Sequence, residues 1–149
     1  MVLATVGHMA LSMRERERFL AEPHIGALSV VERPDRAPLI VPIWYHYAPG
    51  GELWVYTGPA SRKARAIGSA GRFSLMVQRT EPTVRYVSVE GPVTKTAPGS
   101  RERSWEMAAR YLPPDKVADF VEYEQTHLGE HVAIYMQPEH WVSADLGAA

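Results

Sequence analysis

Apolar residues in this chain fall into short runs that are broken by proline and glycine, and several of these runs are rich in β-branched and aromatic residues. Runs of this kind, bounded by turn residues, are typical of β-strands. The pattern predicts strands over residues 24–32, 39–47, 53–57, 73–79, 84–94, 132–136 and 140–143. Pro49-Gly50-Gly51 separates the second run from the third and predicts a hairpin between them.

Helical periodicity is confined to four segments. Ser12 with Glu15 three residues later forms a capping box, and Pro23 ends the helix that follows it. Asp115 is the expected cap of the last helix, with Gly129 after its C-terminus. The predicted helices therefore cover residues 13–22, 61–69, 100–111 and 115–128.

Six or seven strands with few helices, and no alternation of strand and helix, predict a mainly β, α+β fold built on an antiparallel barrel with flanking helices. Some strands are apolar on both faces. Leu53 and Val55 fill the interior, whereas Trp54, Tyr56 and Ile40 need another cover. We expect a homodimer packed through the outer barrel face to supply that cover.

Composition narrows the class of protein. With 149 residues, 46% hydrophobic and 22% charged, residues 1–149 are expected to form one domain. A net charge of −1 disfavours nucleic acid as a partner, and the lack of cysteine excludes disulfides and thiolate sites. No apolar run approaches about 18 residues, so we expect no membrane span and a cytoplasmic location.

The segment after the fourth predicted strand has the composition of an anion site. Thr57 ends a strand, Gly58-Pro59 turns the chain, and Ser61 opens a basic helix with Arg62 and Lys63. Two hydroxyls, two cations and the free N–H groups of a first helical turn can converge on one phosphate-sized group. The segment therefore predicts a phosphorylated cofactor.

Two motifs carry a resemblance to a known family. The run Leu53 to Thr57 (LWVYT) followed by Ser61 to Arg65 (SRKAR) resembles the pyridoxamine 5'-phosphate oxidase-like, FMN-binding split β-barrel flavoproteins, including their deazaflavin (F420)-dependent reductase branch. The similarity extends over residues 24–92 and, more weakly, over 137–145. It implies a split barrel, a homodimer and a bound flavin or deazaflavin.

The resemblance also implies which residues bind the cofactor. Its phosphate is expected at the strand end and the helix start, its ring along the strand before the hairpin, and its ribityl chain beside a polar residue of the next strand. The implied residues are Thr57, Ser61, Arg62 and Lys63 for the phosphate, Val41, Pro42, Ile43 and Trp44 for the ring, and Gln78 for the chain.

The sequence departs from the family pattern in ways that favour F420 over FMN. The strand over residues 39–44 lacks the basic residues that complete the FMN phosphate clamp in the oxidases. Residues 69–72 (SAGR) replace the Asn-Pro or Asp-Pro pair that often follows the basic helix. F420 has an acidic oligoglutamate tail, for which Arg65, Arg72 and Arg79 are candidate ligands.

The expected function is that of an F420H2-dependent reductase, which transfers hydride to a small conjugated acceptor. Because the cofactor supplies this chemistry, no catalytic residue is predicted, although Tyr45, His46 and Tyr86 are candidate proton donors. The first alternative keeps the fold and places FMN in the same site. The second is a non-catalytic carrier of a cofactor or tetrapyrrole.

A rival motif lies near the C-terminus. His127 to His131 (HLGEH) matches the H-x-x-E-H pattern of inverted zinc peptidases, in which both histidines lie on one helical face. Gly129 is expected to end the helix inside the motif, so His131 belongs to the next strand. We therefore expect no metal site.

Overall fold

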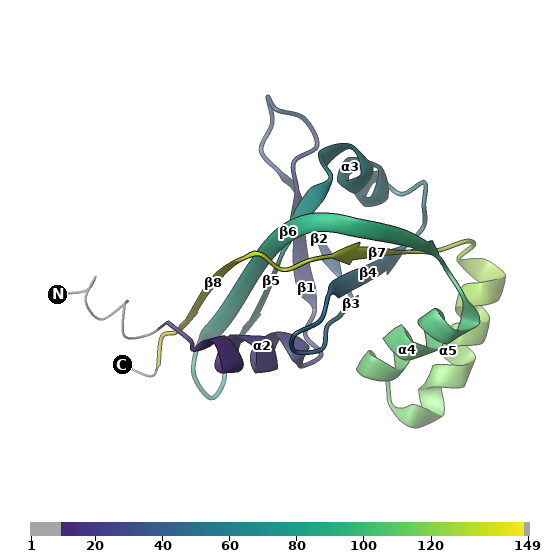
Figure 1. The fold of residues 1–149 in the computed structure, drawn as a ribbon. Helices are drawn as coiled ribbons and strands as arrows, with labels where there is room; N and C mark the ends of the chain where they lie inside the picture. Colours follow the sequence, from purple (N-terminus) through teal and green to yellow (C-terminus); the bar gives the residue numbers. More distant parts are fainter. Residues whose placement is uncertain (1–9, 148–149) are drawn as a thin grey trace.

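A computed structural model of the chain describes residues 10–147, which form one curled antiparallel sheet with helices around it (Figure 1). The helices are α2 (Met13–Ala21), α3 (Arg62–Ala70), α4 (Arg101–Tyr111) and α5 (Pro114–His127). The strands are β1 (Gly26–Val30), β2 (Leu39–Ile43), β3 (Tyr45–His46), β4 (Leu53–Thr57), β5 (Arg72–Arg79), β6 (Arg85–Pro98), β7 (Val132–Met136) and β8 (His140–Asp145).

The strand order β2-β1-β5-β6-β7-β4-β3 places two consecutive strands, β2 and β3, at opposite ends of the sheet, and β8 pairs with β6. The long strand β6 makes this possible. Its first half pairs with β5 and β8, and after a register shift between Val93 and Lys95 its second half pairs with β7. The sheet thus curls into a barrel that stays open between β2 and β3, which confirms the predicted split antiparallel barrel.

Strand register separates an inner from an outer face. Leu28 pairs with Val41 on one side and with Leu75 on the other, and the row continues to Val89 and Trp141. Leu28 and Leu75 are fully buried. Because side chains alternate along a strand, the neighbouring row (Pro42, Ala27, Met76, Ser88 and Val142) lies on the outer face.

Helix α2 closes one end of the barrel. The predicted capping box is present, since Ser12 Oγ accepts from Glu15 N–H and Glu15 Oε1 accepts from Ser12 N–H. Phe19 and Leu20 of this helix are 1% and 0% exposed within the main core. The helix therefore adds to the core that the barrel alone would leave open.

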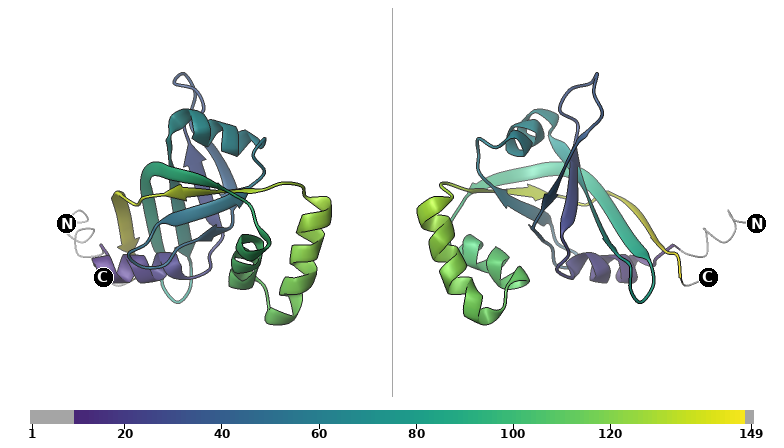
Figure 2. Two further views of the ribbon diagram at one scale, coloured as in Figure 1. Left: turned by 45° about the vertical axis from the view of Figure 1, so that its right-hand side comes forward. Right: turned by 180° about the vertical axis from the view of Figure 1, so that it is seen from behind.

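The helical hairpin of α4 and α5 lies to one side of the barrel in both views of Figure 2 and packs on the outer face of β4 and β7. Trp54 on β4 is 4% exposed and packs with Met107 of α4. The Tyr56 hydroxyl accepts from Ser100 N–H at 3.1 Å. The inference that Trp54 and Tyr56 need a second subunit is thus wrong, because this chain's own helices cover them.

Three further sequence predictions need correction. The strand expected over residues 39–47 is interrupted at Trp44, because Tyr45 N–H donates to the Tyr111 hydroxyl at 3.0 Å. Asp115 is not the cap of α5, since Pro113 occupies that position without a side-chain bond. The described residues contain eight strands rather than six or seven. As a separate finding, no helix within residues 10–147 is long and apolar enough to cross a membrane.

Candidate functional site

Strand β2 lies at an open edge of the barrel. It pairs with β1 alone within residues 10–147, so its other backbone edge has no strand partner in that range. Pro42 lacks an N–H group, and proline is accepted in sheets mainly on edge strands. The position of Pro42 on this edge strand fits that rule. A flat group can therefore lie against this backbone without displacing a strand.

A shallow apolar groove opens beside this edge. Its volume is about 360 Å³, and it is lined by Ile25, Pro42, Ile43, Trp44 and Phe120. Of the residues predicted to contact the cofactor ring, three therefore line one surface. The fourth, Val41, packs toward the barrel core instead.

The predicted phosphate site is assembled at the start of α3. Thr57 Oγ1 and Ser61 Oγ are 3.2 Å apart, and Ser61 Oγ accepts from Ala64 N–H at 3.2 Å as the helix cap. Among residues 10–147 no hydrogen bond is found for the N–H groups of Arg62 and Lys63. These two donors at a helix N-terminus retain their capacity for an anion.

Glu32 forms an ion pair with Arg62, one of the two cations predicted to bind the phosphate. Arg62 donates from Nε and Nη2 to the two carboxylate oxygens of Glu32, each at 2.7 Å, and this bonding lowers the pKa of Glu32. Arg36 and Arg65 add to the positive field around the same carboxylate. Arg62 thus shares its charge with Glu32, while Lys63 and the exposed Arg65 have no ion-pair partner among the described residues.

The β3–β4 register relates the groove to the phosphate site. Tyr45 pairs with Val55, so Thr57, two residues further along β4, lies toward Ile43 and the end of β2. Gln78 is exposed near the end of β5, opposite Tyr86. Ala27 pairs with Met76, so Gln78, two residues further along β5, lies toward Ile25 of the groove.

A family model described as pyridoxamine 5'-phosphate oxidase matches residues 13–143. The chain belongs to this family. This match confirms the family to which the sequence points. Among curated proteins, no sequence matches the chain.

Several solved structures are similar to this chain in fold. A conserved hypothetical protein from Mycobacterium tuberculosis is 24% identical, with a TM-score of 0.72 over 95% of this chain and 91% of that chain. A structure described as an F420 reductase is also 24% identical, with a TM-score of 0.66 over 85% and 94%. An FAD-binding protein from Mesorhizobium loti is 18% identical, with a TM-score of 0.58 over 91% and 94%.

The three arginines suggested for an acidic tail of the family's deazaflavin do not lie together. Arg72 pairs with Glu90 and Glu139. Arg79 is at the opposite end of β5, about 23 Å away at roughly 3.3 Å per residue, and reaches Asp145 Oδ2 at 3.4 Å. Arg65 alone remains on the helix that carries the phosphate site.

The three candidate proton donors, Tyr45, His46 and Tyr86, lie in different surroundings. Tyr45 is fully buried and donates to Leu20 O and Glu22 O at 2.7 and 2.9 Å, and burial raises its pKa far above the ordinary value. Burial lowers the pKa of His46, whose ring stacks on Trp54 at 5.2 Å. Tyr86 is half-buried on β6. Tyr45 is therefore unavailable, which corrects that prediction.

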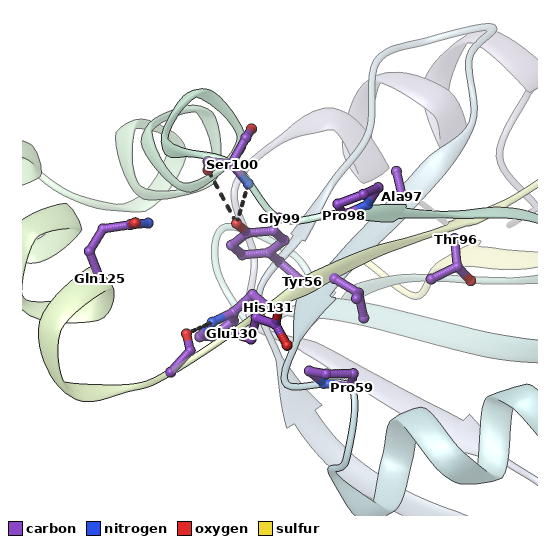
Figure 3. A pocket seen from close by; sticks show the side chains of 12 residues that line it. Tyr56, Pro59, Thr96, Ala97, Pro98, Gly99, Ser100, Gln125, Glu130 and His131 are labelled. Atoms are coloured by element: carbon purple, nitrogen blue, oxygen red, sulfur yellow. Dashed lines mark hydrogen bonds between the residues drawn. The ribbon is translucent and has the colours of Figure 1, made fainter.

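The H-x-x-E-H motif lies at a different cavity, of about 440 Å³, between β4, β6, β7 and the two-helix hairpin (Figure 3). His127 ends α5, whereas His131 follows Gly129, stacks on Tyr56 at 5.0 Å and hydrogen-bonds to Gly129 O. Gly129 has a φ of 73°, so the helix ends inside the motif as expected. No group of three metal-ligating side chains is found within residues 10–147.

Sequence reasoning missed two aromatic residues of the site. Tyr111 stacks on Trp44 with ring centroids 4.7 Å apart and planes 12° apart, and Phe120 follows at 5.4 Å. Both belong to helices that the pattern predicts, but their spacing encodes only an amphipathic face. Nothing local to these helices indicates that they meet residue 44.

Proposed function

We propose that this protein binds coenzyme F420 and acts as an F420H2-dependent reductase on a small conjugated acceptor. The observation that carries the proposal is the arrangement at the start of α3, where a paired Thr57–Ser61 hydroxyl set and two N–H donors lie together, while β2 offers an unpaired edge for a flat ring. A phosphate and an attached flat ring need these two kinds of surface.

The residues present suit the phosphate. Oriented N–H donors, hydroxyls and an ammonium group are the usual partners of phosphate at a helix N-terminus. Thr57 is 5% exposed, so its hydroxyl is held in place by packing. Lys63 is half-buried and without an ion-pair partner among residues 10–147, so its charge is not neutralised by a carboxylate there.

The ring surface suits a deazaflavin or a flavin. Bound F420 in its reduced state would supply a hydride to one end of a conjugated double bond, while the other end takes up a proton and the cofactor is oxidised. The protein's part is to position the two partners and to exclude water. Pro42 and Trp44 present apolar surface for this purpose.

Charge placement favours F420 over FMN in this proposal. Residues 39–44 have no cation to add to the phosphate site, and Arg65 is exposed on α3 where an acidic tail can reach it. FMN in the same site is the alternative. Comparing the two dissociation constants by fluorescence decides between them, and tighter binding of FMN would replace F420 with the flavin.

The test of the phosphate site is the double variant Arg62→Ala with Lys63→Ala. Each charge-assisted hydrogen bond to an anion contributes about 1.5–3 kcal/mol, so the affinity for F420 should fall by roughly a hundredfold or more. Arg33→Ala is the matched control, because Arg33 is exposed and pairs with Asp35 in a loop. Equal dissociation constants for wild type and the double variant would contradict the phosphate assignment.

A further inference from the structure

The α4–α5 hairpin contributes a wall to the groove that the strands alone do not have. Of the five residues that line the groove, Phe120 is the one that belongs to α5, and it lines the groove together with Ile25, Pro42 and Trp44. Phe120 is half-buried and also packs with Ala108, Val117 and Val121 in a small core of the hairpin. One part of its ring is thus anchored, and another part is presented to the groove.

Tyr111 fixes the strand side of the same groove. Its ring stacks on Trp44, and its hydroxyl accepts from Tyr45 N–H at 3.0 Å. The same hydroxyl lies 2.8 Å from His24 O and 3.0 Å from Tyr45 O, to which it can donate. These contacts tie the chain before β1 and the break between β2 and β3 to α4. Tyr111 is therefore a positioning residue for Trp44.

The hairpin is itself anchored to the barrel. Arg110 donates to Ala21 O at 2.7 Å and to Glu22 O at 2.9 Å, which are carbonyl groups at the C-terminal end of α2. Cations stabilise helix C-termini by this kind of contact. The wall is thus preorganised by hydrogen bonds at its base, and Phe120 needs no rearrangement to contact a ligand.

The chemistry of the groove selects a kind of ligand. Its five lining side chains are apolar, and none is charged. An anion placed there would lose hydration without a partner, which is costly. A volume of about 360 Å³ is near the lower end of the roughly 300–1,000 Å³ that is usual for small-molecule sites.

We propose that Phe120 determines acceptor specificity and selects an uncharged, flat acceptor of about one ring. The inference rests on the proposed function, since the acceptor would lie in this groove against the cofactor ring at the β2 edge, on the side of Phe120. It goes beyond that function by naming the acceptor's charge and the residue that selects it. Charged substrates such as phosphorylated amines are excluded from this groove, because their charge would lose hydration there without gaining a partner.

The experiment uses two probes of the same skeleton, benzylideneacetone, which is neutral, and cinnamate, which carries a carboxylate. Their binding to the cofactor-free protein is measured by calorimetry, so the result does not depend on activity. Benzylideneacetone should bind and cinnamate should bind at least tenfold more weakly. Phe120→Ala should weaken benzylideneacetone binding by about tenfold or more, because a phenyl contact is lost.

Matched variants separate contact from folding. Phe120→Leu keeps the core of the hairpin and should restore most of the affinity, whereas Tyr123→Ala, at an exposed aromatic position on the same helix, should change nothing. Ile25→Lys alters a residue that is 60% exposed and should reverse the preference toward cinnamate. Because Ile25 is largely exposed, this variant does not disturb the core.

The failures of the two proposals are distinguishable. Loss of F420 and FMN binding in the wild-type protein would reject the proposed function, while the probe experiment would still report on Phe120. Equal affinity for the two probes, absence of benzylideneacetone binding, or no response to both Phe120→Ala and Ile25→Lys would overturn the inference. F420 affinity in the Phe120 variants does not decide the inference, since Phe120 lines the same groove as Pro42 and Trp44, which are assigned to the cofactor ring.

Discussion

Two parts of the outer barrel surface carry the same sequence pattern and have different surroundings. Outward residues on β4 are covered by α4, so that Trp54 is 4% exposed. Outward residues on the opposite side are bare, with Ile40 and Val142 at 65% and 61% exposure. Alternating apolar residues thus indicate that a strand face needs a cover, but they do not say whether the chain itself supplies it.

The homodimer prediction now depends on the exposed outer surface around Ile40 and Val142. Two adjacent rows cross five strands of the sheet there, one with Pro42 and Val142 at its ends and the other with Ile40 and His140. Ile25 adds a further apolar side chain at 60% exposure next to the groove. A dimer through this surface remains a prediction, and it would place a second subunit beside the open edge of β2.

The largest expected effect is on stability and tests the outer surface of β4 that α4 covers. Trp54→Ala removes a buried aromatic side chain under α4, and such changes cost about 3–5 kcal/mol of unfolding free energy. Trp105→Ala, on the outward side of the same helix with 42% exposure, should change stability by less than about 1 kcal/mol. Urea unfolding followed by circular dichroism measures both. Similar losses in the two variants would mean that α4 does not cover β4.

The next effect is on the oligomeric state and tests the exposed outer surface around Ile40. The wild-type protein should sediment at about twice the chain mass of 16.6 kDa, and Ile40→Asp should shift it to the monomer, because a charge would be buried in the interface. Tyr123→Asp, which places the same charge on an exposed position of α5, should leave the mass unchanged. A wild-type monomer at micromolar concentration would reject the dimer.

A smaller effect distinguishes the arginines that sequence reasoning had grouped. Affinity for F420 should fall with added salt, since exposed charges are screened within about 10 Å at 0.1 M salt. Arg65→Ala should flatten this dependence. Arg79→Ala should not, because Arg79 is bound to Asp145 and Thr83 at the far end of β5. Titrations at several salt concentrations measure the slopes, and equal slopes in the two variants would remove Arg65 from the tail site.

The smallest effect concerns pH on the side of the barrel that α4 covers. Burial lowers the pKa of His46 in the folded protein, so the unfolded chain takes up its proton at a higher pH, near about 6.5. Stability should therefore decline as pH falls from about 7 through 6.5 and should level off below the folded-state pKa. His46→Gln should flatten this part of the profile in urea unfolding series, and the exposed His140→Gln should not.

Much of the fold could be predicted because its signals are local. The Ser12–Glu15 box, the cap at Ser61 and the turn at Gly129 each depend on a few neighbouring residues, and the structure contains all three. The helix start after Thr57 is set in the same way. That part of the candidate site was therefore visible in the sequence.

The rest depended on contacts between residues far apart in the chain. Glu32 takes up the charge of Arg62 thirty positions later, and Tyr111 interrupts a predicted strand by binding the backbone of Tyr45. Such contacts follow from the curl of the sheet and the packing of α4 and α5, neither of which has a local sequence signal. The sequence alone determined the strands, the helix caps and the phosphate-binding segment; the tertiary structure decided which outer face is covered and which aromatic residues wall the groove, because these depend on side chains meeting across the fold.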